Sequence, residues 1–500
     1  MSELTEPTER KSPAGRAAER KSLADQAPER KSPADRAADR KSPADRAPER
    51  KSPADRAADR KSPADRAPER KSLADRAAEL DAADPLAPLR DRFVLDDGGV
   101  YLDGNSLGAL PAGVPDRVAD VVRRQWGELR IRSWGESGWW TAPERIGDRI
   151  APLVGAAPGQ IVVGDSTSVN VFKALVAAVR MAREAGAETA GGSGGSGGTG
   201  EGGRSGGIGG SGGIGGGEGR DEILVDASTF PTDGYIAASA ARMTGCVVRP
   251  VAPHEVTAAL SPRTAAVLLN HVDYRTGRLH DLPSLTAAVH AAGAYAVWDL
   301  CHSAGALPVG LDEHGVALAV GCTYKFLNGG PGSPAFLYVR ADLQERFDSP
   351  LPGWNSHAEP FGMRPDYEPA KGAVRGRVGT PDILSLLALE AALDVWEGVS
   401  VEAVRAKSLA LTDFFLECVA AHVPAGRVES VTPAAHAERG SQVALRCADA
   451  GEVMERLIAR GVVGDFRAPD ILRFGFTPLY VGFADAERAA RVLGEVLKGA

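Results

Sequence analysis

From about residue 115 onward, the sequence alternates between short apolar runs and longer segments with the periodicity of an amphipathic helix. The runs IVVGD (161–165), DEILVDA (221–227) and AYAVWDL (294–300) each adjoin such a helical segment through a short connection. Strands that alternate with helices are typical of a mainly parallel sheet covered by helices. The sequence therefore predicts an α/β fold. From about residue 381, a helical segment followed by the strand patterns QVALRC and ILRFGF predicts a smaller α+β domain.

Two segments do not fit this alternation. Residues 1–84 contain a ten-residue repeat, KSPADRAADR or KSPADRAPER, with almost no apolar side chain larger than alanine, and residues 191–219 are mostly glycine. Neither composition can bury a core, so we expect a disordered tail and a flexible insertion. Proline in most repeats argues against the alternative, a single charged helix. The predicted order is then a tail, an N-terminal arm with the first part of a large domain (85–190), the insertion, the rest of the large domain (220–380), and a linking helix with a small C-terminal domain (381–500).

The charge distribution bears on possible partners. The formal net charge is −8, and the segment 1–80 holds 20 Lys and Arg against 16 Asp and Glu, so the remaining chain is clearly acidic. An acidic body argues against nucleic-acid binding. A role for the tail in binding a partner or an anionic surface would rest only on its repetition and slight positive excess.

The cysteines and the apolar segments indicate a compartment. Five cysteines without a CxxC pair are typical of free thiols in a reducing environment; they are Cys246, Cys301, Cys322, Cys418 and Cys447. The sequence contains no run of 18 apolar residues, and its first residues lack the apolar region of a secretory signal. We therefore expect a soluble cytoplasmic protein without a membrane segment.

Polar residues at the carboxyl ends of the predicted strands are the candidates for chemistry, because open α/β sheets bind ligands at that edge. The segment GDSTSVN (164–170) lies between a strand and a helix. Its hydroxyls and its free backbone N–H groups at a helix N-terminus favour a phosphate, with Thr167 and Ser168 as the contacts. The alternative is an ordinary helix cap, which uses the same residue types.

Two further candidates follow the strand AYAVWD. Asp299 ends this strand, and a carboxylate there can pair with a protonated pyridine nitrogen and keep the ring able to accept electrons. His302 follows three residues later and could lie on or beside the same ring. A buried structural histidine is an equally good interpretation of His302.

Lys325 lies in a glycine-rich turn between the apolar runs VALAVGC and PAFLYVR. A lysine between buried strands tends to lose its proton, and a neutral amine attacks an aldehyde to form a Schiff base. One strand separates Lys325 from Asp299, so we expect the two side chains at neighbouring strand ends. Phosphate turn, carboxylate, histidine and lysine together predict an enzyme that binds pyridoxal 5'-phosphate (PLP), and no metal.

The chain resembles the kynureninase family of fold type I PLP enzymes, the aspartate aminotransferase-like group. The resemblance covers nearly all of the predicted folded part and none of the tail or the insertion. Its motifs are YLDGNSLGALP (101–111), WGESGWW (134–140), GDSTSVNVFK (164–173), FPTDGY (230–235), HVDYRTGRLHD (271–281), WDLCHSAGALPV (298–309), CTYKFLNGGPGSPAF (322–336), GWNSHAEPFGM (353–363) and RVGTPDI (377–383).

The resemblance implies roles for individual residues. Around the cofactor it implies Thr167, Ser168, Tyr324 and Trp354 at the phosphate, Phe230 stacked on the ring with Asp233 nearby, Asp299 at the ring nitrogen, His302 beside the ring, Lys325 as the Schiff-base lysine, and Asn270 and Thr380 at further cofactor positions. Around the substrate it implies Arg473 at the carboxylate, and His357 and Trp134 at the aromatic ring. An arginine suits a carboxylate because its guanidinium can form two parallel hydrogen bonds.

The implied reaction is hydrolysis of L-kynurenine to anthranilate and L-alanine, in tryptophan catabolism. Lys325 would remove the Cα proton, and Tyr324 is the candidate acid/base for carbon–carbon cleavage. The residues leave open whether 3-hydroxykynurenine is also a substrate. The resemblance also implies a homodimer.

Two other functions compete with this interpretation. The first is another fold type I enzyme, such as an aminotransferase or a cysteine desulfurase. A desulfurase needs a reactive cysteine on a mobile loop, whereas Cys418 is expected in a helix and Cys447 at a strand end. The second is a catalytically silent binding protein that acts through its repeat tail, and such a protein would not need the intact lysine, aspartate, tyrosine and phosphate-turn set.

Overall fold

The structure of the chain is a computed structural model that describes residues 71–96, 98–191 and 219–499. The described residues form one compact unit. Most of the predicted tail (1–70) and most of the predicted insertion (192–218) lie outside the described residues. The predicted boundary at residue 380 therefore stays a prediction, because the two sheets described below share one hydrophobic cluster.

The larger sheet has seven strands, and only one of them runs against the others. Its order is β4 (Ile161–Val163), β10 (Phe336–Val339), β9 (Leu318–Gly321), β8 (Tyr295–Asp299), β7 (Thr264–Asn270), β5 (Glu222–Asp226) and β6 (Val247–Val251). Strand β10 is antiparallel to both of its neighbours, and the remaining pairs are parallel. The prediction of a mainly parallel sheet in an α/β fold is confirmed.

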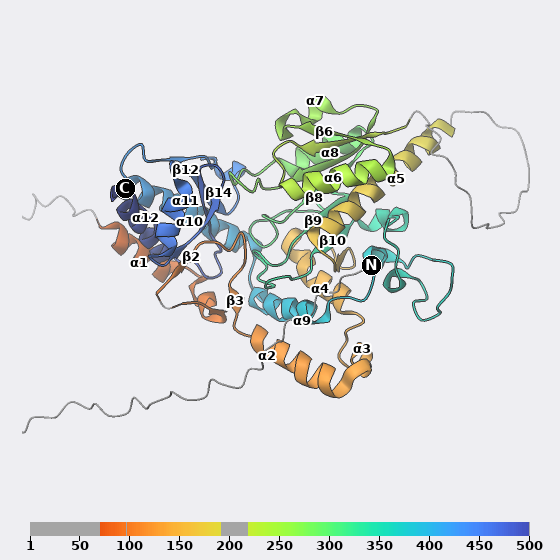
Figure 1. The fold of residues 1–500 in the computed structure, drawn as a ribbon, viewed down its shortest axis with the longest axis horizontal. Helices are drawn as coiled ribbons and strands as arrows, with labels where there is room; N and C mark the ends of the chain where they lie inside the picture. Colours follow the sequence, from red (N-terminus) through yellow and green to blue (C-terminus); the bar gives the residue numbers. More distant parts are fainter. Residues whose placement is uncertain (1–70, 97, 192–218, 500) are drawn as a thin grey trace, which may run out of the picture. The chain divides into compact units, whose positions relative to one another are not determined.

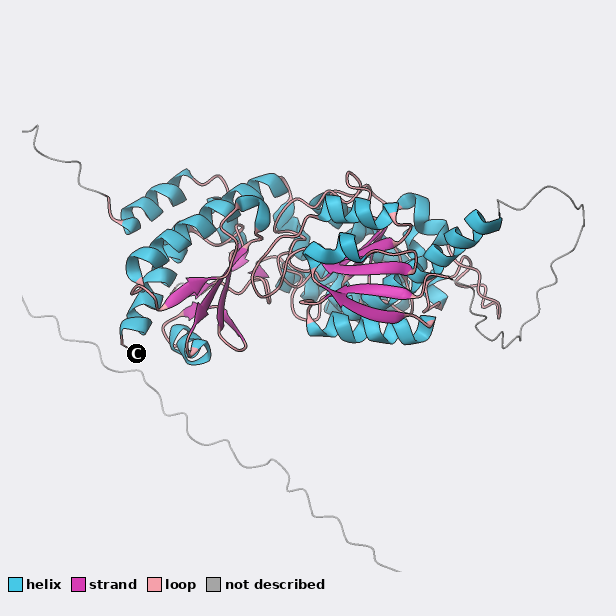
Figure 2. Ribbon diagram, turned by 90° about the horizontal axis from the view of Figure 1, so that it is seen from above, coloured by secondary structure: helices cyan, strands magenta, loops and turns pink. Residues whose placement is uncertain are grey.

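Helices cover both faces of this sheet (Figure 2). Alternate side chains of a strand enter different clusters: in β7, Leu268 packs with α5 and α6, whereas Leu269 packs in the cluster that includes α4 and α8. The side chains alternate between the two clusters because successive residues of a strand point to opposite faces of the sheet. The helices of this region are α2 (Val114–Asp120), α3 (Ser133–Glu136), α4 (Ala142–Ile150), α5 (Thr167–Gly191), α6 (Pro231–Thr244), α7 (Val256–Ala259), α8 (Leu282–Ala291) and α9 (Ile383–Ala392).

The C-terminal part contains a four-stranded antiparallel sheet with helices packed against it (Figure 1). Its strands lie in the order β11 (Val428–Ser430), β12 (Gln442–Cys447), β15 (Ile471–Gly475) and β14 (Asp465–Arg467), and its helices are α10 (Val401–His422), α11 (Ala450–Ile458) and α12 (Phe483–Lys498). The predicted α+β character of this part is confirmed by these elements.

The N-terminal arm packs against the C-terminal elements. Helix α1 (Leu73–Ala83) packs on α12, β2 (Val100–Tyr101) pairs with β13 (Val462–Val463), and β1 (Phe93–Val94) pairs with β3 (Leu110–Pro111). The expectation of disorder through residue 84 is wrong for the end of this segment, which forms helix α1. The last repeat has leucine in place of proline, Ser72 caps its helix by accepting from the N–H of Asp75, and Ala77 is buried.

A buried ion pair joins the N-terminal arm to helix α10. The Nζ atom of Lys407 lies 2.6 Å from Oδ2 of Asp84 and donates to the carbonyl oxygen of Pro478 at 2.6 Å. Both charged side chains are almost fully buried, so removing one charge leaves the other without compensation. We expect Asp84→Ala to lower the free energy of unfolding by about 3 kcal/mol, measured by urea denaturation.

The matched double variant, Asp84→Ala with Lys407→Met, separates charge burial from lost packing. We expect it to recover most of that loss, because no unpaired charge stays buried. A double variant as unstable as Asp84→Ala alone would contradict the explanation.

Within the described ranges, no helix is both long enough and apolar enough to cross a membrane.

Candidate active site

A cavity of about 230 Å³ lies where β7, β8 and β9 end. Ten of the fourteen predicted site residues line it: Thr167, Ser168, Phe230, Asp233, Asn270, Asp299, His302, Tyr324, Lys325 and Arg473. They come from segments that are up to 306 residues apart. The parallel strands of the larger sheet bring nine of them together because their carboxyl ends share one edge, and Arg473 reaches the cavity from β15. This cavity is the candidate active site.

Lys325 lies in the connection between β9 and β10, and its amine faces a histidine. Its Nζ atom is 3.0 Å from Nε2 of His302 and 5.7 Å from the centre of the Tyr324 ring. Burial, and secondarily the charge of Lys325, hold the pKa of His302 well below its ordinary value, so the imidazole is neutral. Its Nδ1 atom is buried and has no hydrogen-bond partner among the described residues.

Asp299 is held at the end of β8 by two hydrogen bonds. Its Oδ1 accepts from the N–H of Cys301 at 2.7 Å, and its Oδ2 accepts from Nδ2 of Asn270 at 2.8 Å. The same Asn270 nitrogen lies 3.2 Å from Oδ2 of Asp233. Burial, followed by the charge of Asp299, raises the pKa of Asp233 to about 8. At neutral pH, Asp233 is therefore mostly protonated.

The predicted phosphate turn leads into α5, which begins at Thr167. The Thr167 hydroxyl lies 3.8 Å from Sγ of Cys301, and Thr167 and Ser168 both line the cavity. The first N–H groups of a helix have no partner within the helix and carry a partial positive charge. The structure thus brings hydroxyls and a helix N-terminus to one wall of the cavity that holds the lysine.

Arg473 reaches the cavity from β15 and is almost fully buried. Its Nε donates to Oδ1 of Asp465 at 2.8 Å, its Nη1 to the carbonyl oxygen of Tyr274 at 2.6 Å, and its Nη2 to the hydroxyl of Ser106 at 2.8 Å. Its Nη2 also donates to Oδ2 of Asp465, so four of the five guanidinium N–H donors have acceptors. The guanidinium is therefore oriented before any ligand arrives.

Burial raises the pKa of two acidic groups near this cavity. The pKa of Asp103 is raised to about 6, first by burial and then by the charge of Asp465. Burial also raises the pKa of Tyr324 above its ordinary value, so its side chain is a neutral phenol at neutral pH.

Four predicted residues do not line this cavity: Trp134, Trp354, Thr380 and His357. Trp134 and Trp354 form an aromatic cluster with Trp140 and Phe361, with ring centres 5.2 to 6.3 Å apart in contacting pairs. Thr380 lines a separate cavity. His357 accepts at Nδ1 from the N–H of Glu359 at 2.8 Å, and its Nε2 lies 3.1 Å from the carbonyl oxygen of Asp366. The proposed roles of these residues stay predictions.

Several lining residues had not been predicted from the sequence: Asn105, Ser106, Thr232, Tyr274, Cys301 and Arg467. Most of them lie inside the motifs on which the family resemblance rests. Their position in these motifs was the signal that could have identified them. Arg467 had no such signal. It reaches the site because β14 pairs with β15, the strand that carries Arg473, and its Nη2 lies 2.6 Å from Oδ2 of Asp465 on the same strand.

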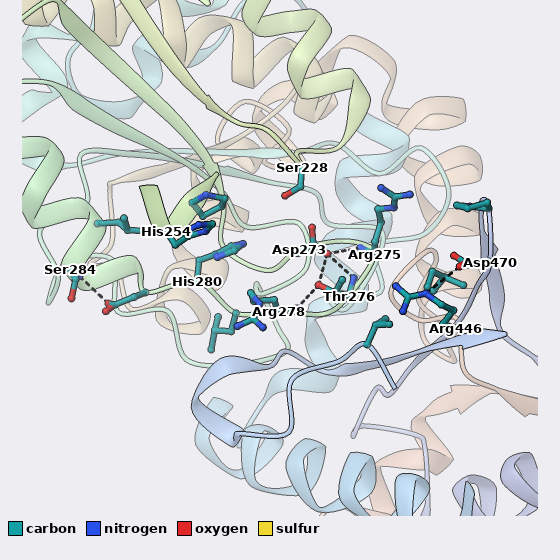
Figure 3. A pocket seen from close by; sticks show the side chains of 17 residues that line it. Ser228, His254, Asp273, Arg275, Thr276, Arg278, His280, Ser284, Arg446 and Asp470 are labelled. Atoms are coloured by element: carbon teal, nitrogen blue, oxygen red, sulfur yellow. Dashed lines mark hydrogen bonds and ion pairs between the residues drawn. The ribbon is translucent and has the colours of Figure 1, made fainter. Parts of the chain in front are cut away.

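A second and larger cavity, of about 1070 Å³, lies beyond the ends of β5, β6 and β7 (Figure 3). Its cations already have partners, since Arg278 contacts Glu438 and Arg446 contacts Glu429, each at 2.9 Å. Among the described residues that line it there is no lysine. The cavity around Lys325 is therefore the better candidate for covalent chemistry with an aldehyde.

Comparison with characterised proteins identifies relatives along most of the chain. Residues 404–493 match the family model described as the kynureninase C-terminal domain. The kynureninase of Deinococcus radiodurans is 48% identical over 424 residues, which cover 84% of this chain and 95% of that protein. The kynureninase of Pseudomonas fluorescens is 44% identical over 421 residues, which cover 84% and 94%.

Solved structures with the same fold are more distant in sequence. The apo cysteine desulfurase of Thermococcus onnurineus NA1 superposes with a TM-score of 0.64 at 16% identity and covers 83% of this chain and 98% of its own. A C-DES variant with glycine covalently linked to its PLP cofactor gives 0.65 at 17% identity, with 81% and 98% covered. At these identities the likeness concerns the fold alone, and it confirms the fold type I architecture.

Proposed function

The chain belongs to the kynureninase family, and we propose that the cavity around Lys325 is the site where this PLP-dependent enzyme hydrolyses L-kynurenine to anthranilate and L-alanine. One observation carries the assignment of the site. The Lys325 amine, the Asp299 carboxylate and the hydroxyls of Thr167 and Ser168 all face one cavity. An amine, an anion and a phosphate-binding turn are the three groups that PLP requires of a protein.

The residues in the cavity fit the cofactor. When bound, PLP supplies an aldehyde that links to an amine and a ring that accepts electrons from the substrate. Lys325 would carry the link, and the fixed carboxylate of Asp299 would keep the ring nitrogen protonated. The buried and unpartnered Nδ1 of His302 marks a place where a bound group would supply a missing hydrogen bond. Phe230 lines the same cavity and offers an aromatic face.

Arg473 is the proposed site for the substrate carboxylate. Its guanidinium is oriented by Ser106, Tyr274 and Asp465, so little freedom would be lost when an anion binds. The amine of Lys325 would then remove the proton from Cα of the substrate. Tyr324, which stays a phenol at neutral pH, would donate the proton during cleavage.

The test of this function combines a spectrum with a turnover assay. The purified full chain should gain absorbance from bound PLP, borohydride should fix the cofactor to Lys325, and kynurenine should yield fluorescent anthranilate. A chain that stays colourless with PLP would contradict the proposal. Comparing kcat/KM for kynurenine and 3-hydroxykynurenine would settle substrate preference, because a pocket favours the extra hydroxyl only if it offers a polar partner.

The two cysteines weighed for the desulfurase alternative, Cys418 and Cys447, do not suit a reactive nucleophile. Cys418 lies within α10 and Cys447 ends β12, as predicted, and both are buried. Burial raises the pKa of Cys418 to about 12 and also raises that of Cys447, so neither thiol is a thiolate at neutral pH. The sequence relatives at 44–48% identity are kynureninases.

We propose that the enzyme is a cytoplasmic homodimer whose partner covers the aromatic cluster around Trp354. Phe361 is 70% exposed and Met363 beside it is 79% exposed. An exposed group of large apolar side chains of this kind is typical of an interface. Trp354 and Thr380, predicted near the cofactor, do not line the cavity of their own chain, which supports a role toward the partner's cavity. All five cysteines are free, as expected of a reducing compartment.

We expect Phe361→Asp to shift the chain from dimer to monomer in sedimentation velocity, because a buried unpaired charge at an interface is costly. Met243→Asp is the matched control. Met243 is 67% exposed on α6, outside the cluster, so this variant should stay dimeric. A dimeric Phe361→Asp variant would place the interface elsewhere.

A further inference from the structure

Lys173 is a charged residue in the interior that the proposed reaction does not use. It lies in α5, two turns after the phosphate turn, and its side chain is 1% exposed. Its Nζ donates to Oδ2 of Asp165 at 2.7 Å and to the carbonyl oxygen of Gly376 at 2.6 Å. The ammonium group therefore joins two segments that are more than 200 residues apart in sequence.

Stability alone does not explain a charge at this position. Burial lowers the pKa of Lys173 while the charge of Asp165 raises it, which is the signature of an ion that is desolvated and then compensated. Replacing a buried ion pair by well-packed apolar side chains is often neutral or stabilising. Lys173 does not line the Lys325 cavity, so any effect on chemistry must pass through the groups that it holds.

The first of these groups belongs to the phosphate turn. Asp165 has a φ of 56°, a left-handed conformation that is unfavourable for a residue with a side chain and persists only when its surroundings fix it. Its carbonyl oxygen accepts from the N–H of Ala335 at 2.9 Å, and its carboxylate is held by Lys173. Two residues later, Thr167 opens α5 at the cavity wall.

The second group that Lys173 holds is the backbone carbonyl of Gly376, which close packing keeps in place. A Cβ atom at Gly376 would lie 2.8 Å from a methyl carbon of Leu337 and 3.0 Å from one of Val162, so this backbone is pressed against the sheet. Its carbonyl oxygen is thus a fixed anchor for Lys173. Residues 376–380 also lead to Thr380, and they line one small cavity together with Asp165 and Lys173.

We propose that Lys173 is a positioning residue for the cofactor phosphate: by bridging Asp165 and the carbonyl of Gly376, it fixes the turn 164–168 in the shape that receives the phosphate group. This inference rests on the proposed function. The bridge acts on the phosphate turn and not on the residues that contact the ring or on the Schiff-base lysine.

The experiment compares PLP with pyridoxal, which has the same ring and aldehyde but no phosphate. Absorbance titrations of the full-length apoenzyme would give the dissociation constants of both probes for wild type and Lys173→Met. We expect Lys173→Met to weaken PLP by at least about tenfold (about 1.4 kcal/mol) and to leave pyridoxal within about twofold. Equal weakening of both probes, or of neither, would overturn the inference.

Lys407→Met is the matched control, because Lys407 is also buried and also bridges a carboxylate and a carbonyl oxygen, but away from the Lys325 cavity. It should lose stability and keep both dissociation constants. If Lys173→Met fails to fold, the pair Lys173→Met with Asp165→Asn removes the bridge without leaving an unpaired charge, and the same selective loss of PLP affinity is expected. A wild-type chain that binds neither probe would contradict the proposed function instead.

Discussion

Replacing Lys325 by alanine should lower kcat for kynurenine hydrolysis by at least about 10⁴-fold, since one residue would serve both as covalent anchor and as base. The amine that faces His302 at 3.0 Å would be lost, while the surrounding cavity stays in place. Anthranilate fluorescence would measure the rate, and mass spectrometry after borohydride treatment would detect the cofactor on the chain. The variant should bind PLP only reversibly.

Lys498→Ala is the control for this variant. Lys498 is an exposed residue in the last turn of α12, so its replacement should change neither rate nor labelling. If Lys325→Ala still acquired one borohydride-stable cofactor per chain and kept its rate, another lysine would be the anchor and the assignment of this cavity would be wrong.

Two neighbouring carboxylates should respond very differently to amidation. We expect Asp299→Asn to lower kcat by at least about 10³-fold, because an amide cannot keep the ring nitrogen protonated. Asp233→Asn should cost less than about tenfold at pH 7, because burial and Asp299 raise the pKa of Asp233 to about 8 and the group is already neutral. Steady-state kinetics of both variants would check the contrast. Equal losses would show that Asp233 works as an anion.

The raised pKa of Asp233 also sets a pH dependence of stability. Between about pH 4 and about pH 8, the folded chain keeps a proton on Asp233 that the unfolded chain releases, so this group's contribution falls as the pH rises. Urea denaturation of the apoenzyme at pH 5 and pH 8 should show a smaller difference for Asp233→Asn than for wild type. An unchanged difference would mean that Asp233 titrates normally.

The sequence predicted those parts of the site that depend on strand ends. Thr167, Asp299 and Lys325 each follow an apolar run, and parallel strands place such positions at one edge whatever the details of packing. The surroundings of Arg473 could not be predicted in this way. Asp465 reaches it through the pairing of β14 with β15, and a three-residue strand leaves too weak a pattern to detect.

The antiparallel direction of β10 could not be predicted either, because the pattern of an apolar run does not depend on the direction of the strand. A usable signal was the connection 322–335, which is rich in glycine and proline and lacks the helical pattern that a parallel crossover requires. The helix at 73–83 was missed for a different reason. Its sequence is nearly that of the preceding repeats, and the distant α12 supplies the surface on which it packs.

Helix α5 carries a consequence for the engineering of this protein. It starts at the cavity and contains 25 residues, so its last turn lies about 37 Å from Thr167 (Figure 1). The chain between Gly191 and Arg220 therefore leaves and re-enters the fold at the edge of the sheet opposite the chemistry. A reporter domain or an affinity tag grafted between these two residues should leave catalysis unaltered.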